Sequence, residues 1–595
     1  MSFTGFDHRQ RYFRSIDELQ KTPEFEQFLT REFPQAASEF PEGVSRRRWI
    51  QMMGASLALG GMAGCRYNRE EIGAFVMRPE GRVPGLPEFF ATNFEWAGAI
   101  VHALITNIEG RPIKVDGNPD HPAYANSQPK DFAENKKLRS AGTDAQTQAS
   151  ILSLYDQDRI PHPLKRAKPG SNPEVFDSDA ASNKLQAWDS LATYILEERA
   201  KLEANGGEGL ALLFEPSQSP SLRRTIADVK AKYPKATLVK YESVYTGNVN
   251  KALAAVGAGK SSFALELDAA KVIVALDTDL FGAEPNAVHN ARQFANHRSP
   301  DGEWVNRLYC IESQYSITGS AADFRLALQS SQIPYLLRKI EAAIDAGTIV
   351  EDRDEDVPYN KLSDQDKIQR VVEAVVGDLL RNKGEGVLCV GSHFDVNVQL
   401  AAIRINAKLG NVGKTIHLYE IPNELADVDS IKLDDFVNRS SEFKSLWIIA
   451  NNPVFTASGD IALADAINKI GNSVYLANHD DETADSCTWS VPATHPLEAW
   501  GDVRAQDGVY GVGQPMIAPL LDGKSAIELL AILAGLPETN GEKIVMETAR
   551  LAAGGTLSER QWKETLHLGF MAGTTAKPFT GELKSEAKSL KGGEL

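Results

Sequence analysis

Lys271-Val-Ile-Val-Ala-Leu-Asp-Thr-Asp-Leu280 contains an apolar run of strand length that ends in two carboxylates. Its aliphatic residues do not alternate with polar ones, which is typical of a strand buried on both faces, as in parallel sheets. Four further runs share this character: residues 209–214, 386–390, 446–450 and 473–477. Together these runs predict the central strands of parallel sheets.

Amphipathic stretches lie between the apolar runs and predict helices. The clearest cover residues 188–202, 221–233, 334–346 and 368–380. Strand, loop and helix repeating in this order is the pattern of doubly wound α/β folds, in which the loops at the carboxyl ends of the strands form the ligand crevice. We therefore expect a multi-domain α/β protein with doubly wound, mostly parallel sheets and a smaller N-terminal domain.

Composition limits the class of protein. The 595 residues are 42% hydrophobic and 24% charged, which suits two to four packed domains. No run of 18 or more apolar residues occurs, so the sequence predicts no transmembrane helix. The net charge of -17 argues against nucleic acid as a partner.

The N-terminal region has the features of an export signal. Arg46 and Arg47 precede a weakly apolar run rich in Gly and Ala, and Ala-Gly-Cys ends it at Cys65. A twin-arginine pair of this kind marks export of folded proteins, and the cysteine is a candidate for lipidation. We expect a chain exported by the Tat pathway to the periplasmic side of the cytoplasmic membrane, peripheral or lipid-anchored. The alternative is an internal helix that happens to hold two arginines.

The other three cysteines are expected to be structural. Cys310, Cys389 and Cys487 lie in or beside apolar strand-like runs, which favours buried free thiols over disulfides.

Several polar residues at predicted strand ends are candidates for a site. Asp277 and Asp279 could bind a nucleotide or cap the next turn, and Glu312 could hydrogen-bond a ribose or serve as a loop acid. The histidines of the later loops lack the short spacing of a metal pair, which favours loop hydrogen bonds over metal ligation; they are His393, His479 and His495.

In order and spacing, the loop sequences resemble the molybdopterin oxidoreductase superfamily. The resemblance rests on Ile113-Lys-Val-Asp-Gly-Asn-Pro-Asp-His-Pro122 and on residues 154–160, 276–280, 308–313, 479–484 and 491–498. It extends from about residue 90 to about residue 570 and is strongest to the B subunit of alternative complex III, which has a similar extended leader. The split of the central domains by an insertion follows from this resemblance.

The chain is expected to have five parts. They are a Tat/lipoprotein leader (1–65), a small N-terminal domain equivalent to a cluster-less iron-sulfur domain (66–150), a split α/β domain (151–245 plus 386–520), an inserted dinucleotide-type domain (246–385) and a C-terminal segment (521–595).

The thiols that the superfamily uses are missing from the sequence. An iron-sulfur cluster needs three or four closely spaced cysteines, and the corresponding segment reads Thr92-Asn-Phe-Glu-Trp-Ala-Gly98. The loop that ordinarily supplies the molybdenum ligand corresponds to residues 241–248, where Ser243 is a conceivable ligand or a turn hydrogen-bonder. We expect no metal or cofactor in this chain and only vestigial roles for Asp277, Asp279 and Glu312.

Two functions follow from the resemblance. The first is a non-catalytic scaffold in a quinol-oxidising respiratory complex of the alternative complex III type. Its implied partners are an iron-sulfur subunit or domain, multihaem and monohaem c-type cytochromes and integral-membrane quinol-binding subunits. The second is an active molybdenum or tungsten reductase of the polysulfide reductase type, holding molybdopterin guanine dinucleotide through non-thiol ligation.

Overall fold

The structure is a computed structural model that describes residues 83–584 except 84, 97–98, 123–140, 244–246, 285, 348, 350–362 and 423–427. The described residues belong to one compact unit, Val83–Leu595. Arg46, Arg47 and Cys65 of the expected export signal lie outside the described residues.

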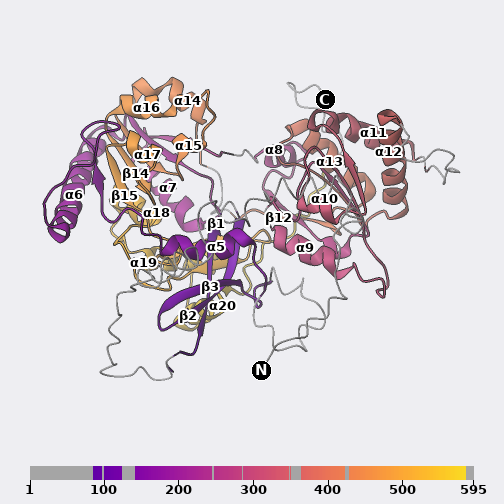
Figure 1. Cartoon of the computed structure of the whole chain (residues 1–595), viewed down its shortest axis with the longest axis horizontal. Helices are drawn as coiled ribbons and strands as arrows, with labels where there is room; N and C mark the ends of the chain where they lie inside the picture. The colour runs from indigo at the N-terminus through magenta and orange to yellow at the C-terminus, as the bar shows by residue number, and fades with distance from the viewer. Residues whose placement is uncertain are drawn as a thin grey trace, which may run out of the picture. The chain divides into compact units, whose positions relative to one another are not determined.

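A six-stranded sheet is built from two distant stretches of the chain (Figure 1). All neighbours are parallel except β4, which runs antiparallel to β15. The spatial order is β4 (Leu164–Lys165), β15 (Trp489–Pro492), β14 (Ser473–Ala477), β13 (Ser445–Ile449), β5 (Leu210–Phe214) and β6 (Thr237–Lys240). Three of these strands, β5, β13 and β14, are the apolar runs identified in the sequence.

Helices cover both faces of this sheet because alternate strand residues point to opposite sides. Leu212 and Trp447 pack with α6 (Ala180–Asn205), α7 (Pro220–Lys232) and α18 (Ala526–Ala534). Leu213 and Ile448 pack on the other face, with α14 (Leu433–Asn438), α16 (Leu463–Ile470) and α17 (Glu482–Ser486). Burial on both faces explains why these strands are continuously apolar.

A second, four-stranded parallel sheet has the order β10 (Phe324–Ala327), β9 (Arg307–Glu312), β8 (Val272–Leu276), β11 (Gly386–Val390). One face packs on α11 (Ile333–Ala346), α12 (Asp364–Arg381) and α13 (Val396–Leu409), and the other on α9 (Ala287–Asn296). An antiparallel pair, β7 (Ser261–Leu265) with β12 (Ile416–Glu420), lies beside α8 (Asn248–Ala255).

Strand pairing moves one expected boundary. Residues 386–520 were predicted to belong to the split domain, yet β11 pairs with β8 and β12 pairs with β7. Residues 386–420 therefore belong with the inserted segment. An apolar run identifies a buried strand, but it does not say which neighbour the strand will pair with.

Two small antiparallel sheets complete the unit. The first consists of β1 (Glu88–Trp96), β2 (Ala99–Ile108) and β3 (Arg111–Gly117), followed by α5 (Ala145–Leu154). The second consists of β16 (Gly501–Arg504), β17 (Tyr510–Gly513) and β18 (Phe570–Met571), accompanied by α19 (Gly541–Ala552) and α20 (Glu559–Leu568). Strand β1 contacts β16 and β17, so the N-terminal sheet packs on C-terminal residues.

The short elements are α10 (Ile317–Ala321), α15 (Pro453–Thr456) and the 3₁₀ turns Leu267–Ala269, Ser330–Gln332 and Ser440–Glu442. The four predicted helices are present as α6, α7, α11 and α12. Helix α6 starts at Ala180, eight residues before the predicted start, because the Asp179 side chain caps it by accepting from the Ser182 N–H.

Three cysteines are buried free thiols, as predicted: Cys310, Cys389 and Cys487. Among the described residues, no helix has the length and apolar character that a bilayer crossing requires.

Candidate functional site

A large crevice of ≈ 2880 Å³ opens where the carboxyl ends of the strands of both parallel sheets meet. Small-molecule pockets usually measure about 300–1,000 Å³, so this space is large enough for a bulky cofactor or a segment of another chain. Its lining includes Asp277, Asp279, Glu312 and Ser243, the residues singled out in the sequence.

Each parallel sheet has a topological switch point at the crevice. The loop after β5 leads to α7 on one face of its sheet, whereas the loop after the adjacent β13 leads to α16 on the other. In the second sheet, β8 leads to α9 and the adjacent β11 leads to α13 on the opposite face. Ligands of open α/β sheets bind at such points.

A glutamate bridges the switch point of the six-stranded sheet. The Asn451 N–H, from the loop after β13, donates to the Glu215 carboxylate, from the loop after β5, at 3.1 Å. Burial and the nearby Glu242 raise the pKa of Glu215 above its ordinary value, although the Asn451 hydrogen bond opposes this shift. The carboxylate has no ion pair to a described Lys or Arg.

Two more carboxylates hold the start of α7. The Glu95 carboxylate, from β1, accepts from the Ser217 hydroxyl at 2.5 Å and from the Gln218 N–H. Asp502, from β16, accepts from the Ser221 N–H at 3.0 Å and from the Ser221 hydroxyl at 2.5 Å. The backbone donors at this helix N-terminus are therefore bound by the chain itself.

Asp277 is held in a strained conformation at the switch point of the second sheet. Its φ of 50° places a non-glycine residue in the left-handed region. A side chain at Gly391, in the loop after the neighbouring β11, would put a Cβ 2.3 Å from the Asp277 carbonyl oxygen, so this close approach requires glycine.

The Asp277 carboxylate is fully engaged. It accepts from the Ser313 N–H and hydroxyl, each at 2.8 Å, and lies 3.4 Å from His393 Nε2. Burial raises its pKa, but hydrogen bonds from Ser330 and Ser313 and the charge of His393 outweigh this and hold the pKa below its ordinary value.

Glu284 lies in the loop after β8, at the switch point of the second sheet. Its carboxylate accepts from the Thr278 hydroxyl of the same loop at 3.0 Å. Burial raises the pKa of Glu284, while the hydrogen bond from Thr278 and the charge of His393 oppose the shift.

Asp279 and Glu312 both hold α10. Asp279 accepts from the Thr318 N–H at 3.0 Å and from the Thr318 hydroxyl at 2.8 Å, so it stabilises the start of a helix 39 residues along the chain and not the turn that follows β8. Glu312 accepts from the Ser316 hydroxyl at 2.5 Å and pairs with Arg325 Nε at 2.5 Å.

Glu312 has little room for another partner. Its side chain is 3% exposed, and a Cβ at Gly319 would lie 1.9 Å from its Oε1 atom. Burial raises the pKa of Glu312, but its hydrogen bonds from Ser316 and Arg325 outweigh this and keep the pKa below the ordinary value. The geometry fits the loop-acid alternative better than a ribose contact.

The residues present do not match a metal centre of the superfamily. Ser243 is exposed and lines the crevice, but in the described part of the chain no group of three or more His, Cys, Asp or Glu has the geometry of a metal site. Cys389 also lines the crevice, yet burial, together with the charge of Glu284, raises the pKa of its thiol to about 12. A thiol with such a pKa is not a ready thiolate ligand.

The three loop histidines make ordinary local contacts. His393 Nε2 lies 3.4 Å from the Ser330 hydroxyl, and His479 Nε2 lies 3.0 Å from the Asp156 carboxylate. His495 lies in the interior, where Nε2 contacts the Ser150 carbonyl oxygen at 3.1 Å.

A buried ion pair at the crevice, between Arg159 and Glu498, was not predicted from the sequence. Arg159 Nη1 and Nη2 donate to the two Glu498 carboxylate oxygens at 3.2 and 2.7 Å, and Nη2 also donates to the Ala493 carbonyl oxygen. The side chains are 4% and 0% exposed. Both lie within loop sequences that carry the family resemblance, but nothing in their spacing indicated that the two loops meet.

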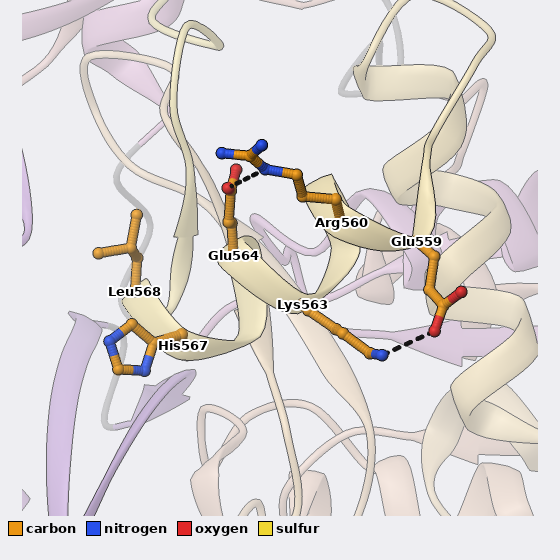
Figure 2. A pocket seen from close by; sticks show the side chains of 6 residues that line it. All are labelled: Glu559, Arg560, Lys563, Glu564, His567 and Leu568. Carbon is orange, nitrogen blue, oxygen red and sulfur yellow. Dashed lines mark hydrogen bonds and ion pairs between the residues drawn. The ribbon is translucent and has the colours of Figure 1, made fainter.

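A smaller pocket of ≈ 650 Å³ lies on α20 and is shown in Figure 2. Its charges pair along the helix, Arg560 with Glu564 and Lys563 with Glu559, each at 2.7 Å. Such i,i+4 pairs are typical of a solvated helix face, so this pocket is not a candidate site.

No family model matches the sequence. The chain is 22% identical over 461 residues to the menaquinone reductase, molybdopterin-binding-like subunit of Nitratidesulfovibrio vulgaris (strain Hildenborough); the match covers 72% of this chain and 62% of that relative. The chain therefore spans under two thirds of the relative's length.

The fold is similar to that of acetylene hydratase from Pelobacter acetylenicus, with a TM-score of 0.51 and 14% identity, covering 79% of this chain and 72% of that one. The predicted α/β fold class is confirmed. The match to the menaquinone reductase subunit supports a distant resemblance to the molybdopterin oxidoreductases.

Proposed function

We propose that this chain is a non-catalytic, molybdopterin-like subunit of a respiratory quinone oxidoreductase complex. The observation that carries the proposal is the similarity to a menaquinone reductase subunit that is itself described as molybdopterin-binding-like. The missing thiol motifs and the engaged strand-end carboxylates support the non-catalytic part, because no described group in the crevice is arranged as a metal ligand set.

We further propose that the chain lies on the periplasmic side of the membrane, in a complex of the alternative complex III type. Its partners there are an iron-sulfur subunit or domain, multihaem and monohaem c-type cytochromes and integral-membrane quinol-binding subunits. The export signal at Arg46 and Arg47 and the lipidation candidate Cys65 support this location. The chain would position the electron carriers of its partners without carrying electrons itself.

A second candidate is an active molybdenum or tungsten reductase. The ≈ 2880 Å³ crevice and the exposed Ser243 at its wall favour it, since a bound cofactor needs a large cavity and an accessible metal ligand. The pterin cofactor would supply the metal and its redox chemistry, and Ser243 would be the protein ligand.

Deletion of the gene, followed by purification of the complex through another subunit, tests the scaffold role. We expect the cytochromes and the membrane subunits to separate and quinol oxidation to be lost, and we expect both to return with the wild-type chain and with Ser243→Ala. Loss of activity from Ser243→Ala in a fully assembled complex would instead favour the enzyme. If the complex assembles and works without the chain, the proposed function is wrong.

A further inference from the structure

The exposed apolar side chains of the described residues are concentrated at the N-terminal sheet. Seven of the eighteen large hydrophobic residues that are exposed there lie between Val83 and Tyr155, on or beside β1, β3 and α5. Single exposed hydrophobic residues are normal on a protein surface, but a group of them marks a surface that another molecule covers.

Three of these residues form one patch, which we call the sheet patch: Ile113, Leu152 and Tyr155. Leu152 and Tyr155 are three positions apart at the end of α5, so they lie on one side of the helix. The Tyr155 hydroxyl donates to the Pro112 carbonyl oxygen at 2.8 Å, which holds this end of α5 beside Ile113 on β3 (Figure 1).

The sheet patch continues a buried core to the surface. Val115, two residues after Ile113 on β3, packs with Ile105 and Leu154 in this core. Phe90 pairs with Ile105 on β2, so it lies on the same face of the sheet, and it is also exposed. The sheet patch is therefore the part of this apolar face that α5 leaves uncovered.

Cationic residues stand at the edge of the sheet patch. Arg111 and Lys114 flank Ile113 on β3, and both are exposed, although Lys114 also pairs with Asp116. Burial raises the pKa of the Tyr155 hydroxyl and the charge of Arg111 opposes this shift, so the guanidinium lies close to the ring. Aliphatic residues with Tyr, Arg and Lys beside them are typical of surfaces that bind at the interface of a bilayer.

The sequence before the described residues offers a tether to the membrane. Seventeen residues, 66–82, separate the lipidation candidate Cys65 from Val83, the first described residue. Such a segment spans at most about 65 Å when fully extended, and it joins the chain at the N-terminal sheet. A tether raises the local concentration of the sheet patch at the bilayer, so a small apolar surface is enough for binding.

We propose that the sheet patch binds the lipid surface of the membrane and thereby fixes the orientation of the chain on the bilayer. This inference rests on the membrane location in the proposed function and deepens it, because it names the face that is turned toward the lipid. The composition of the sheet patch and its closeness in sequence to Cys65 favour lipid over a protein partner at this surface.

The test is quenching of a fluorescent label by lipid. The full chain, extracted from membranes, is reconstituted in vesicles of phosphatidylethanolamine and phosphatidylglycerol in equal parts, with a polarity-sensitive dye on Leu152→Cys. Leu152 is 71% exposed, and the native thiols that could compete for the dye are buried: Cys310, Cys389 and Cys487. We expect a blue shift of the emission and quenching by nitroxide-labelled lipids. The matched control is Leu196→Cys, at a position 62% exposed on α6, which should show neither.

A second substitution tests the contribution of the sheet patch itself. Ile113→Ser in the labelled chain removes an apolar side chain that lipid would cover, and we expect the ratio of bound to unbound patch to fall by on the order of tenfold. The measurement is loss of most of the quenching at residue 152. Leu185→Ser, at an exposed position of α6, is the control and should leave the quenching unchanged.

Equal emission and equal quenching at residues 152 and 196 would overturn the inference, and so would a folded Ile113→Ser chain that is quenched like the parent. Thermal unfolding establishes that the variants are folded; if Ile113→Ser is not, Phe90→Ser replaces it. A label that lipid does not quench but that is shielded in the assembled complex would assign the sheet patch to a protein partner and also overturn the inference.

The result is separable from the proposed function. A chain whose label contacts lipid but that assembles with no membrane subunits contradicts the scaffold role alone. A chain that assembles while the label at residue 152 stays in water contradicts this inference alone.

Discussion

At the residue scale, two stacked histidines show how burial fixes a charge state. The rings of His102 and His121 lie 3.5 Å apart at 9°, and His102 Nδ1 lies 2.7 Å from the Asn93 side-chain oxygen. Burial lowers the pKa of His121 to about 3, and burial with the nearby charges of His121 and His289 lowers that of His102 well below its ordinary value. Both rings are neutral at physiological pH.

This pair predicts acid sensitivity. The ordinary pKa of histidine is 6.5, so His121 takes up a proton below this pH in the unfolded chain. In the folded chain it stays neutral until about pH 3. The free energy of unfolding therefore falls as the pH drops from 6.5 towards 3. At pH 4.5 the loss from one such histidine is about 2.7 kcal/mol. We expect His121→Phe, which keeps an aromatic ring against Phe570, to reduce the pH dependence of urea unfolding between pH 7 and 4.5 by about that amount. An unchanged slope would show that His121 is not the titrating group.

Glu312 provides a second prediction at this scale. Replacing Glu312 by Gln removes a buried charge that binds Arg325 and the Ser316 hydroxyl, and a hydrogen bond to a charged group contributes about 1.5–3 kcal/mol. We expect a loss of this size in the free energy of unfolding, measured in urea, with quinol oxidation by the assembled complex unchanged. A strong loss of activity in an intact complex would instead give Glu312 a functional role.

The local sequence predicted the environment of a single residue where that environment follows from the residue's own strand or loop. The burial of Cys310, Cys389 and Cys487 as free thiols was predicted in this way. The ion pair of Arg159 with Glu498 was not, because the two residues are 339 positions apart and only the folded sheet brings their loops together.

At the element scale, the start of α7 depends on a residue from another sheet. Asp502 of β16 accepts from the Ser219 and Ser221 hydroxyl groups, the Ser221 N–H and the Tyr510 hydroxyl. The carboxylate is buried, and it ties a helix of the six-stranded sheet to the C-terminal antiparallel sheet.

Asp502→Ala leaves several buried donors without an acceptor, and we expect it to lower the free energy of unfolding by on the order of 3 kcal/mol. The comparison is Glu559→Ala on α20, whose exposed pair with Lys563 is worth about 0–1 kcal/mol (Figure 2). Urea unfolding of both variants measures the difference. Equal effects would mean that Asp502 does not anchor α7.

Helices and strands were predictable where the hydrophobic pattern of their own residues identifies them. Continuous apolar runs gave β5, β8, β11, β13 and β14, and amphipathic spacing gave α7, α11 and α12. The pairing of strands was not predictable in the same way. Strand β11 pairs with β8 across the domain boundary expected after residue 385, because packing between distant segments decides which parallel strands become neighbours. The short antiparallel strands β16 to β18 carry too little apolar sequence to be recognised.

At the scale of the whole molecule, the chain combines a fold similar to that of acetylene hydratase with a crevice whose strand-end carboxylates, Asp277, Asp279 and Glu312, are hydrogen-bonded within the chain. At one switch point, a usual ligand position of such folds, Glu215 accepts a hydrogen bond from the Asn451 N–H in the loop after the adjacent strand. The thiols that would hold a metal are absent from the corresponding segments of the sequence. These features together support a subunit that contributes shape and contacts to a complex, with the electron carriers in its partners.

Metal and pterin content of the intact complex tests this account most directly. The complex would be extracted from membranes through this chain, and molybdenum, tungsten, iron and pterin would be counted per chain alongside the co-purifying subunits. The account predicts no molybdenum, tungsten or pterin, with iron and haem assigned to the partner subunits. About one molybdenum or tungsten with two pterins per chain, the stoichiometry of a bis-pterin enzyme, would contradict it.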